Sequence, residues 1–569
     1  MKFAKIDNWG KYRHDGLLYF AQRINEMLDP ENDYSHKAPI LNTRLLVDEY
    51  LETAKSANGS ETIKKEHLKF ILEEFLTSFA EDIVVQNNID KKKRKQILCK
   101  INGGSDEEKR RMMEYTQYLL CDYNLWCKNL LFETVSKREI KSIEHVIRLL
   151  VPGLTALGYS NEFIYQHSID IFYKRPVNSI ESLQVFINRF DSKLREYDVF
   201  IAIDSRAVHF QKILEKHLSI DFGPFSDDIE ILYDKDKYVL TKIRTQAFDE
   251  YTAVKTAYDQ ANIFFTFYLF VIDQPENWCY NETIVVDSEK NRHIIPLKPL
   301  ESNYPKKQDI EFAAFTSDLV VGVLKENASA SYSELNKMLC LHNTSLADSD
   351  IKNRFLNLWS ILEIMFVQNN SQTKIQNIID KALPILQKKY LDDLFYSISS
   401  AIYELNKQLD MSIIEEQILE EDRANWHLTI ICEEKYSEQR NILYSFLADY
   451  PLLKYRISQL SELCKDRKNL LLKVNNHSRR VSWHIRRLYR ARNNIIHSGV
   501  IPSNLHDLVE HLHVYVHLCL ADIVLLLAGK RKLESFSNAH IAIQLRKEEL
   551  ISLLDNHSPF STADLFKIT

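Results

Sequence analysis

The chain has 569 residues, of which 45% are apolar and 27% charged, a composition typical of a globular protein with a large core. Its 11 glycines and 13 prolines are few for this length, so long helices with short polar connections are expected. The formal net charge of −6 excludes a uniformly basic coat for nucleic acid, and eight scattered cysteines without a CxxC pair argue against a zinc cage or disulfide framework.

Residues 1–195 are predicted to form a helical N-terminal region. Apolar residues recur at spacings of three and four, the pattern of amphipathic helices, over 41–51, 67–79, 112–131 and 140–150. A basic run at 91–95, followed by a turn at 102–106, is predicted to be a solvated helix end and loop. The alternative for this run is a secondary phosphate contact. The first residues contain no apolar segment of a secretory signal.

A small α+β region is predicted over residues 196–305, where the composition shifts. Short runs of β-branched and aromatic residues predict strands at 199–203, 229–233, 238–243 and 283–286. A helix is predicted over 249–268. Neither this region nor the rest of the chain contains a GxGxxG, Walker A, GxSxG or HExxH motif. The sequence therefore gives no support to an ATPase, dehydrogenase, α/β-hydrolase or zincin.

A connecting segment at 306–349 leads into a second helical region at 350–535, and residues 536–569 are predicted to be a C-terminal tail. In the second region helices are predicted over 354–367, 375–407, 434–447, 452–464, 478–497 and 505–527. The last of these is the most apolar, but it contains three acids and four histidines, too many for the centre of a membrane span. We therefore predict a mainly α, cytoplasmic protein without a membrane segment.

Positive charge is concentrated between residues 465 and 497. This segment has ten basic side chains and one acid, a net charge of +9, so the rest of the chain carries −15. The ten are Lys465, Arg467, Lys468, Lys473, Arg479, Arg480, Arg486, Arg487, Arg490 and Arg492. Such a field on an acidic protein indicates a polyanionic partner, and the guanidinium fork suits phosphate oxygens. The alternative is a charged face paired with acids elsewhere in the fold.

A helix over this segment would gather much of that charge on one face. With about 100° of rotation per residue, Arg479, Arg486, Arg490 and His497 fall within about 20° of one line, and Arg480 and Arg487 flank it. This face is predicted to present a ladder of guanidiniums to RNA and to end in an imidazole. The helix is predicted to stop at residues 498–499, because Ser-Gly followed by Pro502 is a C-terminal signal.

The end of this segment, LYRARNNIIHSG at 488–499, resembles the RN-x-x-x-H-x-G signature of HEPN-domain ribonucleases. Arg492, Asn493 and His497 match that signature. Residues 354–363 resemble the first helix of the ApeA-like HEPN branch, in which a tryptophan stands four residues before a glutamate, here Trp359 and Glu363. The apolar stretch 505–527 is similar to the last helix of that fold. The resemblance covers about residues 350–530 and implies a C-terminal HEPN helical bundle.

The resemblance implies a metal-independent endoribonuclease that works as a homodimer without a cofactor. His497 would act as general acid or base while the RNA 2′-hydroxyl attacks the adjacent phosphate, Arg492 would stabilise the phosphate charge, and Asn493 would orient the site. The products would carry a 2′,3′-cyclic phosphate and a 5′-hydroxyl. Glu363 would orient an arginine of the motif, and a plain structural ion pair is its alternative role.

Two arginines compete for the catalytic role. An ideal helix separates Arg492 from His497 by about 140° of rotation and about 7.5 Å of rise. Either the helix ends early, near residue 496, or Arg492 reaches a phosphate bound by the partner protomer. Arg490 lies on the face of His497 and is the rival. Arg492 is preferred because an asparagine follows it, and Arg490 is predicted to be a supporting phosphate contact.

His513 and His517 stand four residues apart on one predicted helical face, the spacing of two metal ligands. The sequence offers no identifiable third ligand. Two histidines on a core helix are more often packed than ligating, so no metal is assigned.

Three functions fit these features. The first is an antiphage or abortive-infection effector in which residues 1–345 sense a phage-derived trigger or restrain the HEPN dimer. RNA is the expected partner, and a transfer RNA anticodon loop is one candidate target because proteins read single-stranded RNA most readily. The second is a non-catalytic RNA-binding or dimerisation scaffold. The third is the toxin of a toxin–antitoxin pair, with the antitoxin as its partner.

Overall fold

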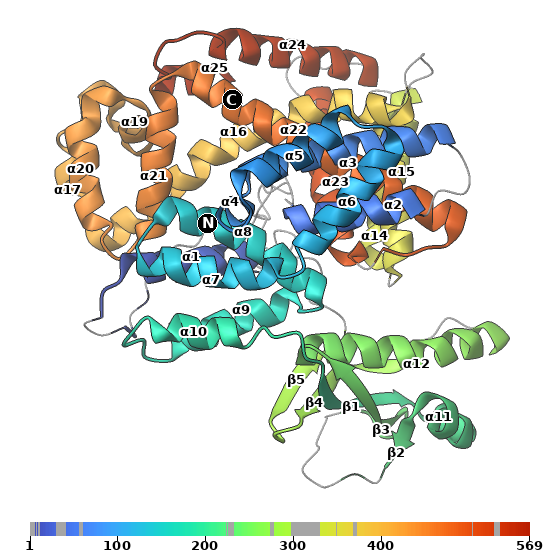
Figure 1. Ribbon diagram of the computed structural model, residues 1–569. Coiled ribbons are helices and arrows are strands. Elements are labelled where there is room, and N and C mark those ends of the chain that lie inside the picture. The colour runs from blue at the N-terminus through green and yellow to red at the C-terminus, as the bar shows by residue number, and fades with distance from the viewer. Residues whose placement is uncertain are drawn as a thin grey trace.

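The computed structural model describes residues 6, 8–9, 12–29, 41–55, 61–223, 225, 233–272, 278–297, 330–348, 350–367, 373–502, 504–528 and 535–568. The protein is mainly helical, with a five-stranded antiparallel sheet in the central part of the chain (Figure 1). The prediction of a mainly α protein with a small central α+β region is confirmed.

The first part of the chain is a helical assembly around one apolar core. Its elements are α1 (Asp15–Leu28), α2 (Thr43–Lys55), α3 (Glu61–Glu81), α4 (Ile83–Asn88), α5 (Lys91–Gly103), α6 (Asp106–Leu119), α7 (Tyr123–Ser136), α8 (Ile140–Leu157), α9 (Asn161–Ile169), a π turn (Asp170–Lys174) and α10 (Glu181–Asn188). Helix α1 lies at the centre and packs against α7, α8 and α9. Its Tyr19 and Phe20 are fully buried, which explains why apolar residues occur on every side of this helix.

Capping residues fix several helix boundaries in this assembly. The Asp90 carboxylate accepts from the backbone N–H of Lys93 at the start of α5, and Ser105 forms a capping box with Glu108 at the start of α6. The basic run 91–95 is thus the first turn of α5, a mostly solvated helix end as predicted.

The helical apolar spacing over 112–131 is divided between two helices. A turn at 120–122 separates α6 from α7, although the apolar spacing runs on through it. The turn redirects the chain so that the buried Tyr123 hydroxyl donates to the carboxylate of Asp82, at 2.6 Å.

The central sheet has the strand order β2-β3-β1-β4-β5, and each neighbouring pair is antiparallel. The strands are β1 (Arg195–Asp204), β2 (Ile220–Phe222), β3 (Tyr238–Ala247), β4 (Cys279–Asp287) and β5 (Arg292–Pro296). A 3-10 turn (Ser205–Phe210) and α11 (Gln211–Leu218) connect β1 to β2. Helix α12 (Glu250–Ile272) covers one face, where its Ala253, Ala257 and Ala261 pack against Val199 and Ile201 of β1.

Three of the four predicted strands, at 199–203, 238–243 and 283–286, are confirmed, as is the helix predicted over 249–268. Residues 229–232 of the strand predicted at 229–233 lie outside the described residues. The edge strands β2 and β5 were not predicted, because three and five residues are too few to show a clear alternation.

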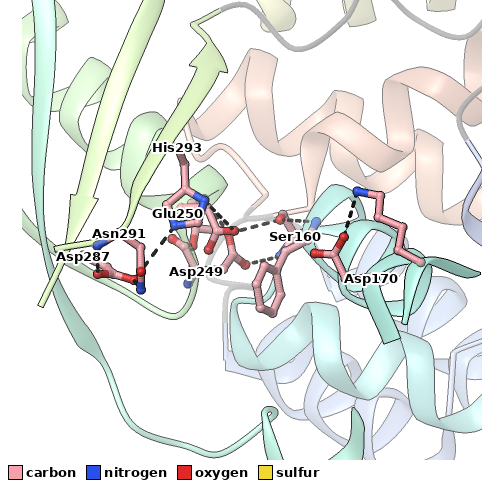
Figure 2. A network of polar contacts seen from close by, with 10 residues as sticks. Ser160, Asp170, Asp249, Glu250, Asp287, Asn291 and His293 are labelled. Carbon is pink, nitrogen blue, oxygen red and sulfur yellow. Dashed lines mark hydrogen bonds and ion pairs between the residues drawn. The ribbon is translucent and has the colours of Figure 1, made fainter. Parts of the chain in front are cut away.

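A buried carboxylate joins the sheet region to the helical assembly (Figure 2). Asp249 is fully buried and accepts from the backbone N–H of Ser160 at 2.7 Å and from that of Thr252 at 2.8 Å. It therefore satisfies backbone donors at the starts of both α9 and α12. Nearby, His293 lies within 4.0 Å of Glu250 and 3.9 Å of Asp287.

The last part of the chain is a second helical assembly with two apolar cores. Its elements are α14 (Ala330–Ala347), α15 (Ile351–Phe366), α16 (Lys374–Leu409), α17 (Ser412–Glu415), α18 (Glu420–Arg423), α19 (Trp426–Cys432), a 3-10 turn (Glu434–Tyr436), α20 (Ser437–Phe446), α21 (Pro451–Cys464), α22 (Arg467–Asn493), a π turn (Asn494–Ser498), α23 (Leu505–Ala528), α24 (Phe536–Leu554) and α25 (Thr562–Ile568). The long helices α16 and α22 run through both cores and connect them.

The core around α15 and α23 extends beyond residues 350–535. Helix α14, from the predicted connecting segment, contributes Leu335 and Met338, and α24, from the predicted tail, contributes Phe536, Ala539 and Ile543. These side chains are buried because they recur at helical spacing and fill the space beside α15, α16 and α23.

Among the described residues, α23 is the one helix long and apolar enough over 505–527 to cross a membrane by length and composition. Half of its most apolar window is buried within the protein, where it packs against α15, α16 and α24. Core helices of folded domains pass the same test of length and composition.

Gly158 offers a test of the junction between α8 and the sheet region. Its φ of 114° is unfavourable for other residues, and a Cβ there would lie 2.6 Å from the Phe248 ring. Gly158→Ala is therefore expected to lower the free energy of unfolding by roughly 1–3 kcal/mol. Gly103→Ala is the matched control, since a Cβ there meets nothing within 4 Å. Thermal unfolding of both variants measures the difference, and equal midpoints would contradict the packing described.

Candidate functional site

Helix α22 carries the predicted site. Asp466 caps its first turn by accepting from the backbone N–H of Lys468 at 2.9 Å. Leu470 and Val474 bury in one apolar core, and Val481, Ile485 and Leu488 bury in the other. The sequence LLLKVNNHSRRVSWHIRRLYRA thus alternates core and polar positions at helical spacing, so the arginines must point away from the cores toward neighbouring helices or solvent.

The helix widens where the predicted motif lies. Its α-helical part ends at Asn493, and residues Asn494–Ser498 form a π turn that stops at Gly499, whose φ is 63°. A π turn holds more residues per turn than an α-helix, so Arg492 and His497 differ less in direction than the 140° of an ideal helix. Of the two alternatives for this geometry, an early end of the α-helix is the one observed, and the change begins before residue 496.

Arg492 is held by Glu363 on α15. Its Nη2 lies 3.6 Å from Glu363 Oε1, and its Nη1 donates to Asn493 Oδ1 at 3.2 Å. The Trp359 indole N–H donates to the same Glu363 oxygen at 2.9 Å, one helical turn earlier on α15. The structure therefore brings Arg492, Asn493, Glu363 and Trp359 together. Glu363 contacts the arginine of the motif, and the Arg492 side chain is still 21% exposed.

His497 lies in the π turn and is exposed. Within the part of the chain that the structure describes, its imidazole makes no hydrogen bond or ion pair. Three apolar side chains beside it are also exposed: Ile496 by 47%, Val500 by 56% and Ile501 by 50%. An exposed imidazole surrounded by exposed aliphatic groups has the character of an interaction surface.

The predicted ladder of exposed guanidiniums is wrong for three of its members. Arg486, Arg487 and Arg490 are buried, with 7–9% of their surface exposed. They contact α2 and α3 of the N-terminal assembly, so the alternative of a charged face paired within the fold holds for them. The partners lie more than 400 residues away in the sequence, which is why the pairing could not be predicted.

Arg487 and Arg490 form an ion-pair network with two N-terminal glutamates. Arg487 donates to both oxygens of Glu49 at 2.8 and 2.9 Å and to Glu74 at 2.8 Å. Arg490 donates to Glu49 as well. Burial alone would raise the pKa of Glu49, but the two guanidiniums outweigh it and lower this pKa to about 2. Burial raises the pKa of Glu74 despite the opposing charge of Arg487.

Arg486 is held differently. Its guanidinium lies 3.5 Å from the centre of the Phe70 ring on α3, and Nη2 donates to Gln376 of α16 at 2.7 Å. The exposed Glu66 is 4.0 Å away. Burial, followed by Arg490 and Arg486, lowers the pKa of the neighbouring His67 to about 4, so this histidine is neutral at pH 7.

The other two predicted RNA contacts differ from each other. Arg479 is exposed, and its guanidinium lies over the Trp483 ring at 5.3 Å from the centroid. Arg480 is half-buried and lines an internal cavity. Of the predicted RNA-binding arginines Arg479, Arg480, Arg486 and Arg487, only Arg479 therefore faces solvent fully.

The described residues contain no group of three or more histidine, cysteine, aspartate or glutamate side chains placed to hold a metal ion. His513 Nε2 lies 3.0 Å from Nε2 of His342 on α14. Burial and the nearby His342 and His517 lower the pKa of His513 to about 3. This histidine therefore packs as a neutral imidazole.

Comparisons with models of known protein families, with curated proteins and with solved structures give no match. The functional inference therefore depends on the site itself: a guanidinium fixed by Glu363 and Asn493, and an exposed imidazole in the following π turn.

Because the Glu49 carboxylate pairs with two buried guanidiniums, we expect the free energy of unfolding to depend strongly on it. Glu49→Gln leaves two buried guanidiniums with reduced compensation and is expected to lower the free energy of unfolding by roughly 3 kcal/mol at pH 7. The difference from wild type should shrink as the pH falls from about 4.5 toward 2, because the carboxylate then protonates and loses the same attraction.

Glu66→Gln is the matched control, since this glutamate is half-exposed and 4.0 Å from Arg486. Thermal unfolding at pH 7 and at pH 3 measures both effects. A Glu49→Gln protein as stable as Glu66→Gln at pH 7 would contradict the network.

Proposed function

We propose that the protein is a metal-independent endoribonuclease of the HEPN type, with its bundle in the C-terminal assembly. The observation that supports this most is the arrangement at the end of α22. Arg492 is fixed by Glu363 and Asn493, and His497 is exposed one π turn later. This pairs a charge that stabilises phosphate with a group able to transfer protons, on the RN-x-x-x-H sequence.

In the proposed reaction, the 2′-hydroxyl of RNA attacks its own 3′-phosphate and the bond to the 5′-oxygen breaks. An imidazole takes the proton of the 2′-hydroxyl, and an imidazolium returns a proton to the leaving 5′-oxygen. Arg492 stabilises the charge that develops on the non-bridging oxygens. The products are a 2′,3′-cyclic phosphate and a 5′-hydroxyl, and neither a cofactor nor an oxidant is needed.

A homodimer supplies the two proton-transfer groups. One His497 serves as base and the partner's His497 as acid when the two π turns meet across an interface. The exposed Ile496, Val500 and Ile501 next to His497 support this, because association would remove their surfaces from water. Asn493 keeps the Arg492 guanidinium oriented within each protomer.

The N-terminal assembly is well placed to restrain the enzyme. Its Glu49 and Glu74 hold Arg487 and Arg490 of the helix that leads to His497, ten and seven residues before the histidine. A cytoplasmic ribonuclease must be held inactive until it is needed, and this supports an antiphage or abortive-infection effector that responds to a phage-derived trigger. A separate antitoxin would serve the same purpose in a toxin–antitoxin pair.

A non-catalytic RNA-binding scaffold is the competing function. It is favoured by Arg479, which is exposed beside Trp483 and able to contact phosphate and base together. Salt-sensitive RNA binding without new RNA ends would identify it.

Cleavage of total RNA in the presence of EDTA tests the proposal. The wild type should yield fragments with 2′,3′-cyclic phosphate ends, and His497→Ala should reduce the rate at least 100-fold, since it removes the proton-transfer group. His217→Ala is the matched control, because this histidine is exposed on α11, far from the motif in sequence. Equal cleavage by wild type and His497→Ala would contradict the proposal. So would a wild-type protein that arrests growth in cells and binds RNA but, like His497→Ala, does not cleave it.

A further inference from the structure

A large cavity lies between the two helical assemblies. Its volume is about 2260 Å³, and its walls come from α2 and α8 of the first assembly, from α12 and β5, and from α21, α22 and α23 of the second. Arg490 and Asn493 reach its wall, but Arg492 and His497 do not line it. The cavity is therefore separate from the proposed catalytic imidazole and exceeds the usual volume of a small-molecule pocket.

Four basic side chains on one part of this wall form what we call the inner basic cluster. They are Arg148 of α8, Arg456 of α21, and Lys473 and Arg480 of α22. A fifth cation, Arg23 of α1, adjoins them. Three helices of the two assemblies thus direct these four cations, and α1 a fifth, into one cavity.

The acids near the cluster do not balance it. Glu144 and Glu26 each accept from Arg23 at 2.7 Å, and Arg456 lies 3.1 Å from Glu26. These two carboxylates therefore pair with Arg23 and Arg456. Within the described residues, Arg148, Lys473 and Arg480 make no hydrogen bond or ion pair, so five cations face two acids.

The positive charges of the cluster lower the pKa values of their neighbours. Lys473 lines the cavity and keeps solvent exposure, and desolvation together with Arg148 and Arg480 lowers its pKa to about 8. Burial and the charges of Arg480, Arg23 and Arg456 lower the pKa of Arg148 to about 10 despite the attraction of Glu144. Repulsion of this kind destabilises a fold, and it is relieved when an anion binds between the cations.

We propose that the inner basic cluster binds a small molecule carrying two or more phosphate charges, with Arg148, Lys473 and Arg480 as its main contacts. Guanidinium forks match phosphate oxygens, and a lysine supplies a mobile point charge beside them. Because the four cations come from three helices and converge on one part of the wall, a compact ligand is able to contact all of them at once. This site does not depend on the proposed ribonuclease activity. A ligand here would contact α8 and α22 at once and so join the two assemblies.

Binding of inorganic tripolyphosphate and of ATP to the full-length protein tests the site by calorimetry and thermal unfolding. Saturable binding with a rising unfolding midpoint is expected for at least one probe. Binding of both indicates recognition of the phosphates alone, and binding of ATP only indicates a nucleotide. Lys473→Gln and Arg480→Gln should each weaken binding at least tenfold.

The unliganded variants separate binding from folding. Because each change removes a repelled charge, Lys473→Gln and Arg480→Gln should unfold at the same temperature as wild type or higher. Lys468→Gln is the matched control on α22: it is exposed, 3.8 Å from Asp555, and should bind as wild type does.

Three results would overturn the proposal. One is the absence of binding of both probes at millimolar concentration. Another is a Lys468→Gln variant whose binding of the probes is weakened as much as that of Lys473→Gln or Arg480→Gln. The third is RNA binding that depends on Lys473 while neither probe binds, which would assign the cluster to a nucleic-acid strand.

Discussion

The ion pairs between Arg487 and Arg490 of α22 and Glu49 and Glu74 of the N-terminal assembly decide how the rest of the structure is arranged. They fix the orientation of α22, which runs through both apolar cores of the C-terminal assembly and ends in the π turn with His497. Buried charges are stable only when they are paired, so the N-terminal assembly cannot leave this helix without exposing or neutralising both partners. A change in the position of the end of α22 is therefore linked to a change in its contact with α2 and α3.

The positive charge of α22 has three different environments, and each implies a different role. The buried guanidiniums of Arg486, Arg487 and Arg490 hold the two assemblies together. Lys473 and Arg480 line a cavity in which five cations face two acids, and there we propose an anion site. Arg492, paired with Glu363, is partly exposed beside the end of the helix, where we propose that it contacts an RNA phosphate. One basic segment of the sequence thus divides into buried ion pairs, a proposed anion site and a proposed catalytic arginine.

Helical periodicity predicted most of the fold, and it failed where tertiary contacts override it. The break between α6 and α7 at 120–122 is invisible in the apolar pattern, because the residues on both sides are core residues. Helix α24 was assigned to a tail, since its apolar face becomes evident only against α16 and α23. The link from Arg492 to Glu363 follows the resemblance to HEPN proteins, while the partners of Arg487 lie 413 and 438 residues away and leave no local signal. The inner basic cluster draws on three helices and could be found only in the folded chain.

We propose that the N-terminal assembly, through Glu49, restrains a ribonuclease site at the end of α22. RNA cleavage by the purified Glu49→Gln variant, compared with wild type and with the double variant Glu49→Gln/His497→Ala, tests it most directly at a temperature where all three proteins are folded. If Glu49 restrains the site, Glu49→Gln should cleave RNA faster than wild type, leaving 2′,3′-cyclic phosphate ends, and the double variant should not cleave. Cleavage by Glu49→Gln no faster than wild type, or cleavage that survives the loss of His497, would contradict it.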